Sequence, residues 1–434
     1  MTERLTSEAQ GLFTVLRQSA DPEAVAEIER FVAEARDRDL CRVNAIDFAA
    51  SRRLDEERVI AAFLHAARLG IFELSWNVLC PGCGGVLDTS TTLKSVKHDD
   101  YICALCAEGY QPNLDEMVEV TFTVSRRVRK IAAHEPDELP FFEYMRQIFW
   151  ASGMNIPENL EELGQEITLD TLELPAGEKA QLSLQLPAEF LILFDPVTHA
   201  AQFIDVKGEP TRERQNLSMV LNNLRAPTGT VAMRPGPLRL SLENRTEMRV
   251  LPAIWIAGHA LHELLGQRRP FLTAKRLLTN QTFRDLYRSD TIDPHQHLKI
   301  TSLTFLFTDL KGSTELYQRV GDLAAFDLVQ AHFRVLHEIV AAQAGAVVKT
   351  IGDAVMATLC LAVVLNDRQD YFGQTVNIAS RVQNLAASRA IYATGQVVEH
   401  PQTASMLAAS GVRPVPQQRE LRGIPEAVPV YEIP

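Results

Sequence analysis

Apolar positions recur with helical spacing through the first 70 residues. Residues 1–37 have apolar side chains every three or four positions, and a second helical pair is predicted at Val43–Arg52 and after Asp55, which can cap a helix that ends at Gly70. Residues Ile71–Trp76 follow as a strand. This order is compatible with a winged-helix fold. We favour the alternative, a small packing or protein-contact module, because the second helix carries few basic residues.

Between residues 112 and 251 the pattern changes to a period of two. Val118, Val120 and Phe122 alternate with polar neighbours, and similar runs follow, separated by Pro- and Gly-containing turn signals. We predict an antiparallel β domain, arranged as a sandwich, with a helical insert at about Phe141–Ala151. No catalytic pattern occurs here, so the region is either a scaffold or the binding place of an unknown regulatory ligand or protein.

Residues 252–290 return to helical spacing and are predicted as a helical linker that extends to residue 298. His259 and His262 lie three positions apart, beside Glu263. A zinc protease helix needs two histidines four positions apart, so these side chains are assigned a structural role.

The composition is that of a soluble globular protein of several domains. The chain has 434 residues, of which 46% are hydrophobic and 23% charged, and two to four domains are expected from this length. Its formal net charge of -12 argues against nonspecific nucleic-acid binding. No apolar run reaches the roughly 18 residues of a membrane span, and the first residues lack the apolar core of a signal peptide. We expect a cytoplasmic protein.

Four of the six cysteines form two Cys-x-x-Cys pairs, Cys80 with Cys83 and Cys103 with Cys106. In a reducing compartment such pairs indicate metal ligands before disulfides, and no thioredoxin-like pattern supports a redox role. We predict a zinc ribbon over residues 77–111. Four thiolates leave zinc no open coordination position, so the ion would be structural.

Two aspartates stand at the ends of apolar, strand-like runs near the C-terminus. Asp309 lies in the segment Phe307–Thr314, and Asp353 ends the segment Lys349–Asp353. Two carboxylates brought together at strand ends suit a pair of hard divalent cations. A third segment, Asp370–Arg381, completes the pattern.

These three segments, in this order, resemble the catalytic domain of the class III nucleotidyl cyclases, which close ATP or GTP into a cyclic monophosphate. The resemblance covers about residues 299–434 and implies a ferredoxin-like fold. It implies that Asp309 and Asp353 bind two Mg²⁺ or Mn²⁺ ions. Gly312 would let the backbone approach the triphosphate, and Ser313-Thr314 would begin a helix whose amides face phosphate oxygens.

The same resemblance assigns the remaining substrate contacts. Lys349 and Asp370 match the positions that read adenine, which favours ATP over GTP. Asn377 would orient the ribose and Arg381 would neutralise charge on the phosphate in the transition state, and their spacing of four puts them on one helix face. Arg422 stands where the family usually has a lysine for the terminal phosphates.

In the family, the metal pair lies on one subunit and the other groups on its partner. All of these residue types are present in this chain, so the resemblance implies a head-to-tail homodimer with two equivalent sites. The front half also resembles an uncharacterised, zinc-ribbon-bearing region found ahead of some bacterial cyclases.

One departure from the family concerns the 16 residues from Ala354 to Gln369. The family places a helix and a strand there, which need roughly 20 to 30 residues with their loops. The cyclase domain is therefore predicted to lack this helix-strand segment.

We thus predict a multidomain α+β protein that acts as an adenylate cyclase. The alternatives are a catalytically impaired pseudo-cyclase that binds nucleotide or dimerises, and a zinc-ribbon and winged-helix transcription regulator.

Overall fold

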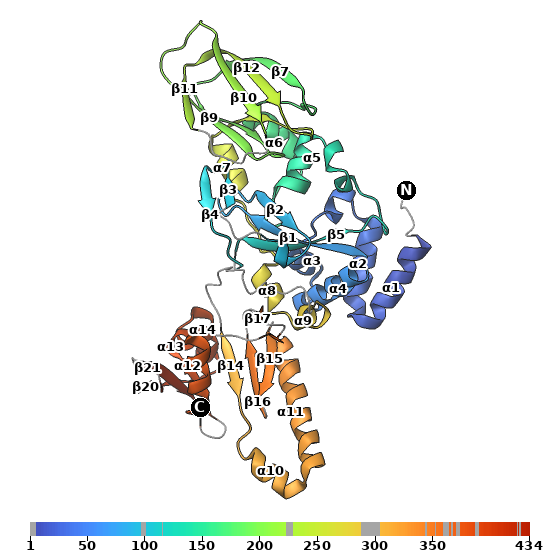
Figure 1. The fold of residues 1–434 in the computed structure, drawn as a ribbon, viewed down its shortest axis with the longest axis vertical. Coiled ribbons are helices and arrows are strands. Elements are labelled where there is room, and N and C mark those ends of the chain that lie inside the picture. The colour runs from blue at the N-terminus through green and yellow to red at the C-terminus, as the bar shows by residue number, and fades with distance from the viewer. Residues whose placement is uncertain are drawn as a thin grey trace. The chain divides into compact units, whose positions relative to one another are not determined.

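The protein is described from a computed structural model of the chain. The described residues are 6–96, 101–114, 116–222, 229–287, 304–342, 345–351, 353–358, 364–365, 368–369, 374–386, 390–422, 424 and 427–434. The chain divides into two compact units, Met1–Ala274 and Lys275–Pro434 (Figure 1). Helical front elements, a β-rich middle and a C-terminal α+β part confirm the predicted multidomain α+β class.

Unit 1 begins with four short helices whose starts are set by side-chain caps. They are α1 Ser7–Ser19, α2 Pro22–Glu34, α3 Ala45–Arg52 and α4 Glu56–Arg68. The side chains of Thr6, Asp21, Asn44 and Asp55 each accept a hydrogen bond from a backbone N–H of the first turn. Such caps satisfy donors that a helix start otherwise leaves bare, and Asp55 was predicted in this role.

A three-stranded antiparallel sheet, in the order β2-β1-β5, packs against these helices. Its strands are β1 Phe72–Leu79, β2 Val86–Ser90 and β5 Val118–Val124. The ring of Phe63 on α4 lies 5.1 Å from that of Phe72 and 5.0 Å from that of Phe122, measured between centroids. Burying an aromatic side chain of this kind stabilises the fold by about 1.5–3 kcal/mol. The β5 segment was predicted as part of the β domain; it instead pairs with β1.

Short elements lie between the front helices and strands, and between β5 and the middle of unit 1. They are the hairpin β3 Tyr101–Cys103 and β4 Glu108–Tyr110, the helices α5 Phe141–Tyr144 and α6 Leu160–Ile167, and 3-10 turns at Asp37–Leu40, Leu93–Ser95, Ala132–His134 and Pro136–Glu138. The predicted insert at 141–151 is thus helical at its start, and it continues as a π-helical turn, Met145–Phe149.

The middle of unit 1 is a two-sheet sandwich around one apolar core. Within the described residues the sheets have the orders β10-β12-β7 and β11-β9-β8-β13-β6. Their strands are β6 Thr168–Thr171, β7 Lys179–Leu186, β8 Phe190–Asp195, β9 Ala200–Val206, β10 Gln215–Leu221, β11 Thr230–Met233, β12 Gly236–Asn244 and β13 Ala253–Ile256. The core contains Leu191, Leu193 and Ile204 from one sheet and Leu238 and Leu240 from the other.

Two expectations for this region were wrong. The domain is not purely antiparallel, because β10 pairs with β12 and β11 pairs with β9 in parallel. Residues 253–256 are a strand and not the start of a helical linker. Alternation predicts which face of a strand is buried, but it carries no information about the direction of the partner strand.

Unit 1 ends in a connecting segment, residues 267–273, that is tied to the front sheet. The N–H of Val120 on β5 donates to the carbonyl of Leu272 (2.8 Å), and the N–H of Arg269 donates to the carbonyl of Gly153 (2.9 Å). The side-chain amide of Asn44 donates to the carbonyl of Pro270 (2.8 Å). The helix α7 His259–Gly266 precedes this segment.

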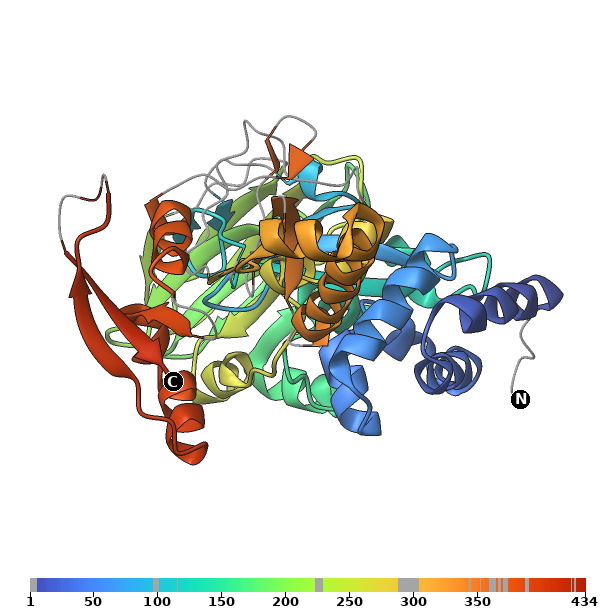
Figure 2. The same ribbon diagram turned by 90° about the horizontal axis from the view of Figure 1, so that it is seen from below.

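Unit 2 opens with the short helices α8 Ala274–Leu278, whose first residue closes unit 1, and α9 Gln281–Leu286. Sheet A follows, formed by β14 Phe305–Thr308, β16 Ala354–Thr358 and β15 Ala346–Ile351 in that order. The helices α10 Ser313–Val320 and α11 Asp322–Ala342 connect β14 to β15. Figures 1 and 2 show α11, in orange, alongside this sheet.

The two faces of sheet A are covered by different helices. Phe333, Leu336 and Val340 of α11 pack against one face, at Val355 and Ala357. On the other face, Val376 of α12 (Gln374–Gln383) packs with Phe305, Phe307 and Met356. The opposite side of α12 packs on sheet B, which has the order β19-β21-β20.

The remaining elements of unit 2 are β17 Val364–Leu365, β18 Arg368–Gln369, β19 Ile391–Thr394, α13 Gly395–Val398, α14 Pro401–Ala409, β20 Val415–Arg419 and β21 Val428–Ile433. Across the part of the chain that the structure describes, none of the helices combines the length and the apolar character needed to cross a bilayer.

Candidate functional site

The two candidate metal-binding aspartates leave sheet A at the same end. Asp309 directly follows β14, and Asp353 lies in the turn between β15 and β16. Thr308 pairs with Val355, and Ile351 pairs with Ala354. Neighbouring strands lie about 4.8 Å apart. This register therefore brings both aspartates to the same end of the sheet, next to the adjacent strands β14 and β16.

The side chains at this end of sheet A suit the binding of hard cations. Asp309 is exposed and Asp353 is half-buried, so both carboxylates remain within reach of solvent ions. The hydroxyl of Thr308, next to Asp309, is buried and has no hydrogen-bond partner among the described residues. Carboxylate and hydroxyl oxygens are ligands of the type that Mg²⁺ and Mn²⁺ prefer, so the residues present suit these ions.

The turn after Asp309 requires glycine and begins a helix. Gly312 has φ of +81° and is the N-cap of α10, which starts at Ser313 as predicted. A side chain at this φ would strain the backbone, because only glycine adopts the left-handed region freely. The N-terminal turn of α10, including the backbone of Thr314, therefore follows Asp309 within a few residues, and its first N–H groups have no partner within the helix.

The helix α12 places the candidate Arg381 on a flank between two packed faces. Val376 contacts sheet A, whereas Ile378 and Val382 contact sheet B. Arg381 falls between these faces on the helix surface and is half-buried. The backbone of Asn377 lies four positions earlier on the same helix.

Arg422 and Lys349 lie on other elements of unit 2. Leu421 packs in the same cluster as Val382, so the exposed Arg422 follows a residue that is anchored against α12. The backbone of Lys349 lies on β15, two pairs of the ladder before the turn that carries Asp353. Asp370 lies outside the described residues.

The stretch between β16 and α12 is short. From Thr358 to Gln374 the described residues contain only the two-residue strands β17 and β18, which pair with each other. No helix occupies this stretch in the described residues. Most of this stretch lies outside the described residues, so the lack of a helix-strand segment stays a prediction.

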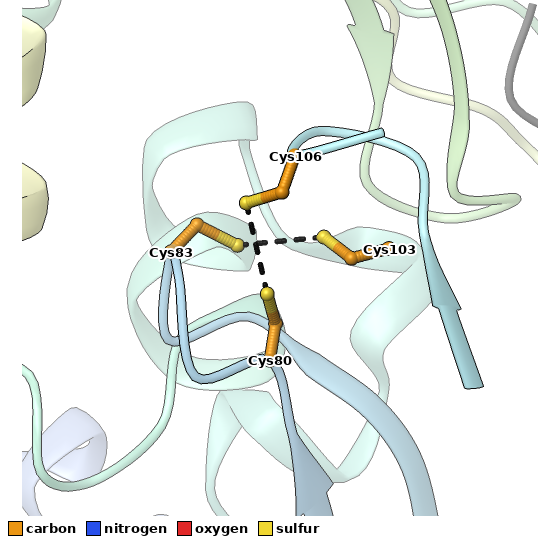
Figure 3. Close-up of side chains that lie close together, drawn as sticks. All are labelled: Cys80, Cys83, Cys103 and Cys106. Atoms are coloured by element: carbon orange, nitrogen blue, oxygen red, sulfur yellow. Dashed lines mark hydrogen bonds between the residues drawn. The ribbon is translucent and has the colours of Figure 1, made fainter. Parts of the chain in front are cut away.

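A second candidate site is the cluster of four cysteines in unit 1 (Figure 3). The first pair, Cys80 and Cys83, follows β1, and the second pair, Cys103 and Cys106, sits at the β3–β4 hairpin. All four sulfur atoms lie within 4.8 Å of one another, and Figure 3 shows them converging on one point.

The sulfur distances fit a tetrahedral metal. The Sγ atoms of Cys80 and Cys106 are 3.6 Å apart, as are those of Cys83 and Cys103. A disulfide would need about 2.05 Å, whereas four sulfurs at about 2.3 Å from zinc lie ~3.8 Å from each other. The cluster is therefore compatible with zinc, with no coordination position left open.

Groups around the cysteine cluster complete the site. Hydrogen bonds from the thiols of Cys103 and Cys106 hold the pKa of Cys80 well below its usual range, so one thiolate forms readily. Arg268 donates to the carbonyl of Gly82, between the first two cysteines (2.8 Å). Burial and the neighbouring Cys80 sulfur raise the pKa of Tyr110. Outer contacts of this kind orient the ligands of a metal.

A buried polar group on β5 was not predicted. Glu119 is fully buried and accepts hydrogen bonds from the amide of Asn77 (3.1 Å) and from the N–H (3.1 Å) and hydroxyl (2.9 Å) of Ser152. Burial raises the pKa of the Glu119 carboxyl. In the alternating β5 pattern this position looked solvent-facing, and no other sequence signal distinguishes it.

Comparison with known families divides the chain in two. Residues 6–285 match a family of unknown function (DUF5939). Residues 295–368 match the adenylate and guanylate cyclase catalytic domain. The second match includes Asp309, Lys349 and Asp353, and it ends before Asp370 and Arg381. No curated protein matches the chain.

Two solved structures are similar to part of the chain. The adenylyl cyclase CyaB from P. aeruginosa is 18% identical; the match covers 30% of this chain and 93% of that chain, with a TM-score of 0.26. A structure of adenylate cyclases from Trypanosoma brucei in their monomeric state is also 18% identical. That match covers 30% of this chain and 88% of that chain, with a TM-score of 0.27. At these values we base no conclusion on either likeness.

Proposed function

We propose that this chain, which belongs to the DUF5939 family and carries a nucleotidyl cyclase catalytic domain behind that family's region, converts ATP to 3',5'-cyclic AMP and pyrophosphate. The observation that carries the proposal is the position of Asp309 and Asp353. Both leave one end of sheet A beside the glycine-capped start of α10, within the segment that matches the cyclase family.

Asp309 and Asp353 hold the metal ions in this proposal. Two Mg²⁺ or Mn²⁺ ions bound there supply Lewis acidity, which lowers the pKa of the ribose 3'-hydroxyl and offsets charge on the phosphates. The two carboxylates would fix where the ions sit, and the cations would offset the mutual repulsion of the two acids. The first N–H groups of α10, at Ser313 and Thr314, face phosphate oxygens across the turn made by Gly312.

The other side of the nucleotide is read by polar and basic groups. Lys349 donates to N1 of adenine and Asp370 accepts from its exocyclic amine, so that guanine would leave both groups unpaired. Asn377 orients the ribose, and Arg381 stabilises charge on the phosphorus as the ring closes. Arg422 contacts the departing pyrophosphate through its planar, two-pronged guanidinium.

The active assembly in this proposal is a head-to-tail homodimer. Asp309 and Asp353 of one subunit then face Asn377 and Arg381 of the other, and two equivalent sites form. The protein acts in intracellular signalling, with structural zinc in its front half and an unidentified regulatory ligand or protein acting there.

A second candidate function follows from the short stretch between β16 and α12. It is too short for a helix and a strand, and a displacement near 1 Å in a catalytic group can lower a rate about 100-fold. A pseudo-cyclase that binds nucleotide without turning it over would meet this description.

Incubating the purified full-length protein with ATP and Mn²⁺, and with GTP in parallel, separates the two candidates. Cyclic AMP formation that depends on Mn²⁺ and on Asp309 supports the cyclase. Metal-dependent ATP binding with no cyclic product at high protein concentration rejects the cyclase and supports the pseudo-enzyme.

A further inference from the structure

One hydrogen bond joins the end of the DUF5939 region to the cyclase sheet within unit 2. The side-chain oxygen Oε1 of Gln281, at the start of α9, accepts from the backbone N–H of Val347 on β15 (3.2 Å). Gln281 lies inside the 6–285 match and Val347 inside the 295–368 match. The contact therefore crosses the boundary between the two matched regions.

Gln281 is held in place for this contact by its own helix. Its amide Nε2 donates to Oδ1 of Asp285, one turn later (3.0 Å), which leaves Oε1 facing the strand. Asn280 caps α9 by accepting from the N–H of Phe283 (3.0 Å), and the ring of Phe283 stacks on that of Tyr287 (5.1 Å between centroids). These contacts hold α9 and the side chain of Gln281 in place. The atom Oε1 of Gln281 is therefore a fixed hydrogen-bond acceptor.

The partner of Gln281 lies at an irregular point of an edge strand. Among the described strands β15 is the outermost of sheet A, so its outward N–H groups have no ladder partner in that part of the sheet. A β-bulge begins at Val347: this residue pairs with Ala357, but Lys349 pairs with Met356, so Val348 is the extra residue. Gln281 thus supports the backbone where the bulge starts.

The bulge decides the register of position 349. In a regular ladder this position would pair with Val355, whose side chain packs against α11. The extra residue shifts the pairing to Met356, which belongs to the opposite face of sheet A, the face that α12 covers. Bulges next to active sites are commonly the feature that sets the local backbone register.

We propose that Gln281 is a positioning residue for the candidate base-reading Lys349. By accepting the N–H of Val347, Gln281 fixes the bulge and with it the register of position 349. This inference rests on the proposed cyclase function, and it makes the last helix of the DUF5939 region part of the apparatus that distinguishes ATP from GTP.

Three variants of the full chain test the proposal. Gln281→Leu removes the acceptor at nearly constant volume. The double variant Q281E/D285N restores it, because one carboxylate oxygen accepts from Val347 while the other accepts from the new amide at position 285. Gln330→Leu, at an exposed position of α11, makes the same substitution away from the contact.

The first measurement is hydrogen exchange at the N–H of Val347, which does not depend on catalysis. We expect faster exchange in Q281L, and the wild-type rate in Q281E/D285N and Q330L. The second measurement is kcat/KM for ATP divided by kcat/KM for GTP. We expect this ratio to fall about tenfold in Q281L and to recover in the double variant. The Mn²⁺ concentration for half-maximal activity should stay unchanged.

Each outcome decides the proposal separately from the cyclase function. Unchanged exchange at Val347 in Q281L overturns the contact, and faster exchange with an unchanged nucleotide ratio overturns the positioning role. If the wild type forms no cyclic nucleotide, the proposed function fails, and the ratio of Kd values for ATP and GTP replaces the kinetic ratio. If Q281L does not fold, Asp285→Ala releases the clamp on Gln281; both effects should then appear at smaller size, and their absence overturns the proposal.

Discussion

Thr308 pairs with Val355 across sheet A, and this single pairing brings the two candidate metal ligands to the same end of the sheet. Asp309 follows the first of these residues, and Asp353 stands two positions before the second. Acidic side chains at adjacent strand ends repel unless a cation lies between them.

Neutralising either aspartate should abolish metal-dependent activity. Asp309→Asn or Asp353→Asn removes one anionic ligand while keeping the size of the side chain, and we expect a loss of roughly 100-fold or more in kcat with Mn²⁺. Cyclic AMP formation is the measurement. Asp322→Asn, at the start of α11, is the matched control and should keep wild-type activity. A D309N enzyme that retained full turnover would contradict the assignment.

Mixing two inactive variants should restore part of the activity if each site is shared between subunits. Asp309→Asn damages only the metal side, and Arg381→Ala only the basic side. Random pairing of equal amounts leaves one intact site in half of the dimers, so about a quarter of wild-type activity is expected. The rate of the mixture, compared with each variant alone at equal total protein, is the measurement. Mixtures no better than their components would place all groups in one subunit.

Removing one ligand of the cysteine cluster should cost both metal and stability. We expect about one zinc per chain in the wild type, and loss of that zinc in Cys80→Ser, which has only three of the four thiolates. Because metal binding is coupled to folding, the free energy of unfolding should fall by roughly several kcal/mol. Elemental analysis and thermal unfolding measure the two effects. Cys41→Ser removes a half-buried cysteine outside the cluster and should retain zinc. Wild-type protein free of zinc after purification without chelator would argue against the site.

Stability of unit 1 should fall as the pH rises through the titration of Glu119. Burial raises the folded-state pKa of this carboxyl above its ordinary value, so between the two values the folded state binds more protons than the unfolded state. The slope of unfolding free energy against pH is then negative in this window. Glu119→Gln removes the titration, so we expect its stability relative to wild type to increase between pH 4.5 and neutrality.

The melting temperature measured from pH 4.5 to 8 checks this expectation. Glu73→Gln, at an exposed position of β1, serves as the control and should follow the wild-type curve. Parallel curves for E119Q and the wild type would mean that the carboxyl titrates equally in both states.

Features that depend on neighbouring residues in the sequence could be predicted well. Asp55 caps α4, α10 begins at Ser313, and each Cys-x-x-Cys pair presents two sulfurs from one tight turn, because short-range geometry fixes each of these features. The order of strand β14, Asp309 and helix α10 also depends only on residues that are close together in the sequence.

Features that depend on which distant segments pair could not be predicted. The apolar alternation of β5 correctly indicated a strand with one buried face, but it did not reveal that β1 is the partner or that Glu119 is covered on the other face. The same limit applies to the parallel pairs of the sandwich and to the bond from Val347 to Gln281, which are 66 positions apart. A period of two specifies exposure and leaves the partner open.

The binding of residues 267–273 to β5 and Asn44 affects how the chain can be dissected. A truncation that stops before Leu272 leaves the N–H of Val120 bare along a strand edge, and such an edge recruits strands from other molecules. We expect such a truncated protein to aggregate. An isolated front half should therefore be cut no earlier than Thr273 if it is to stay monodisperse.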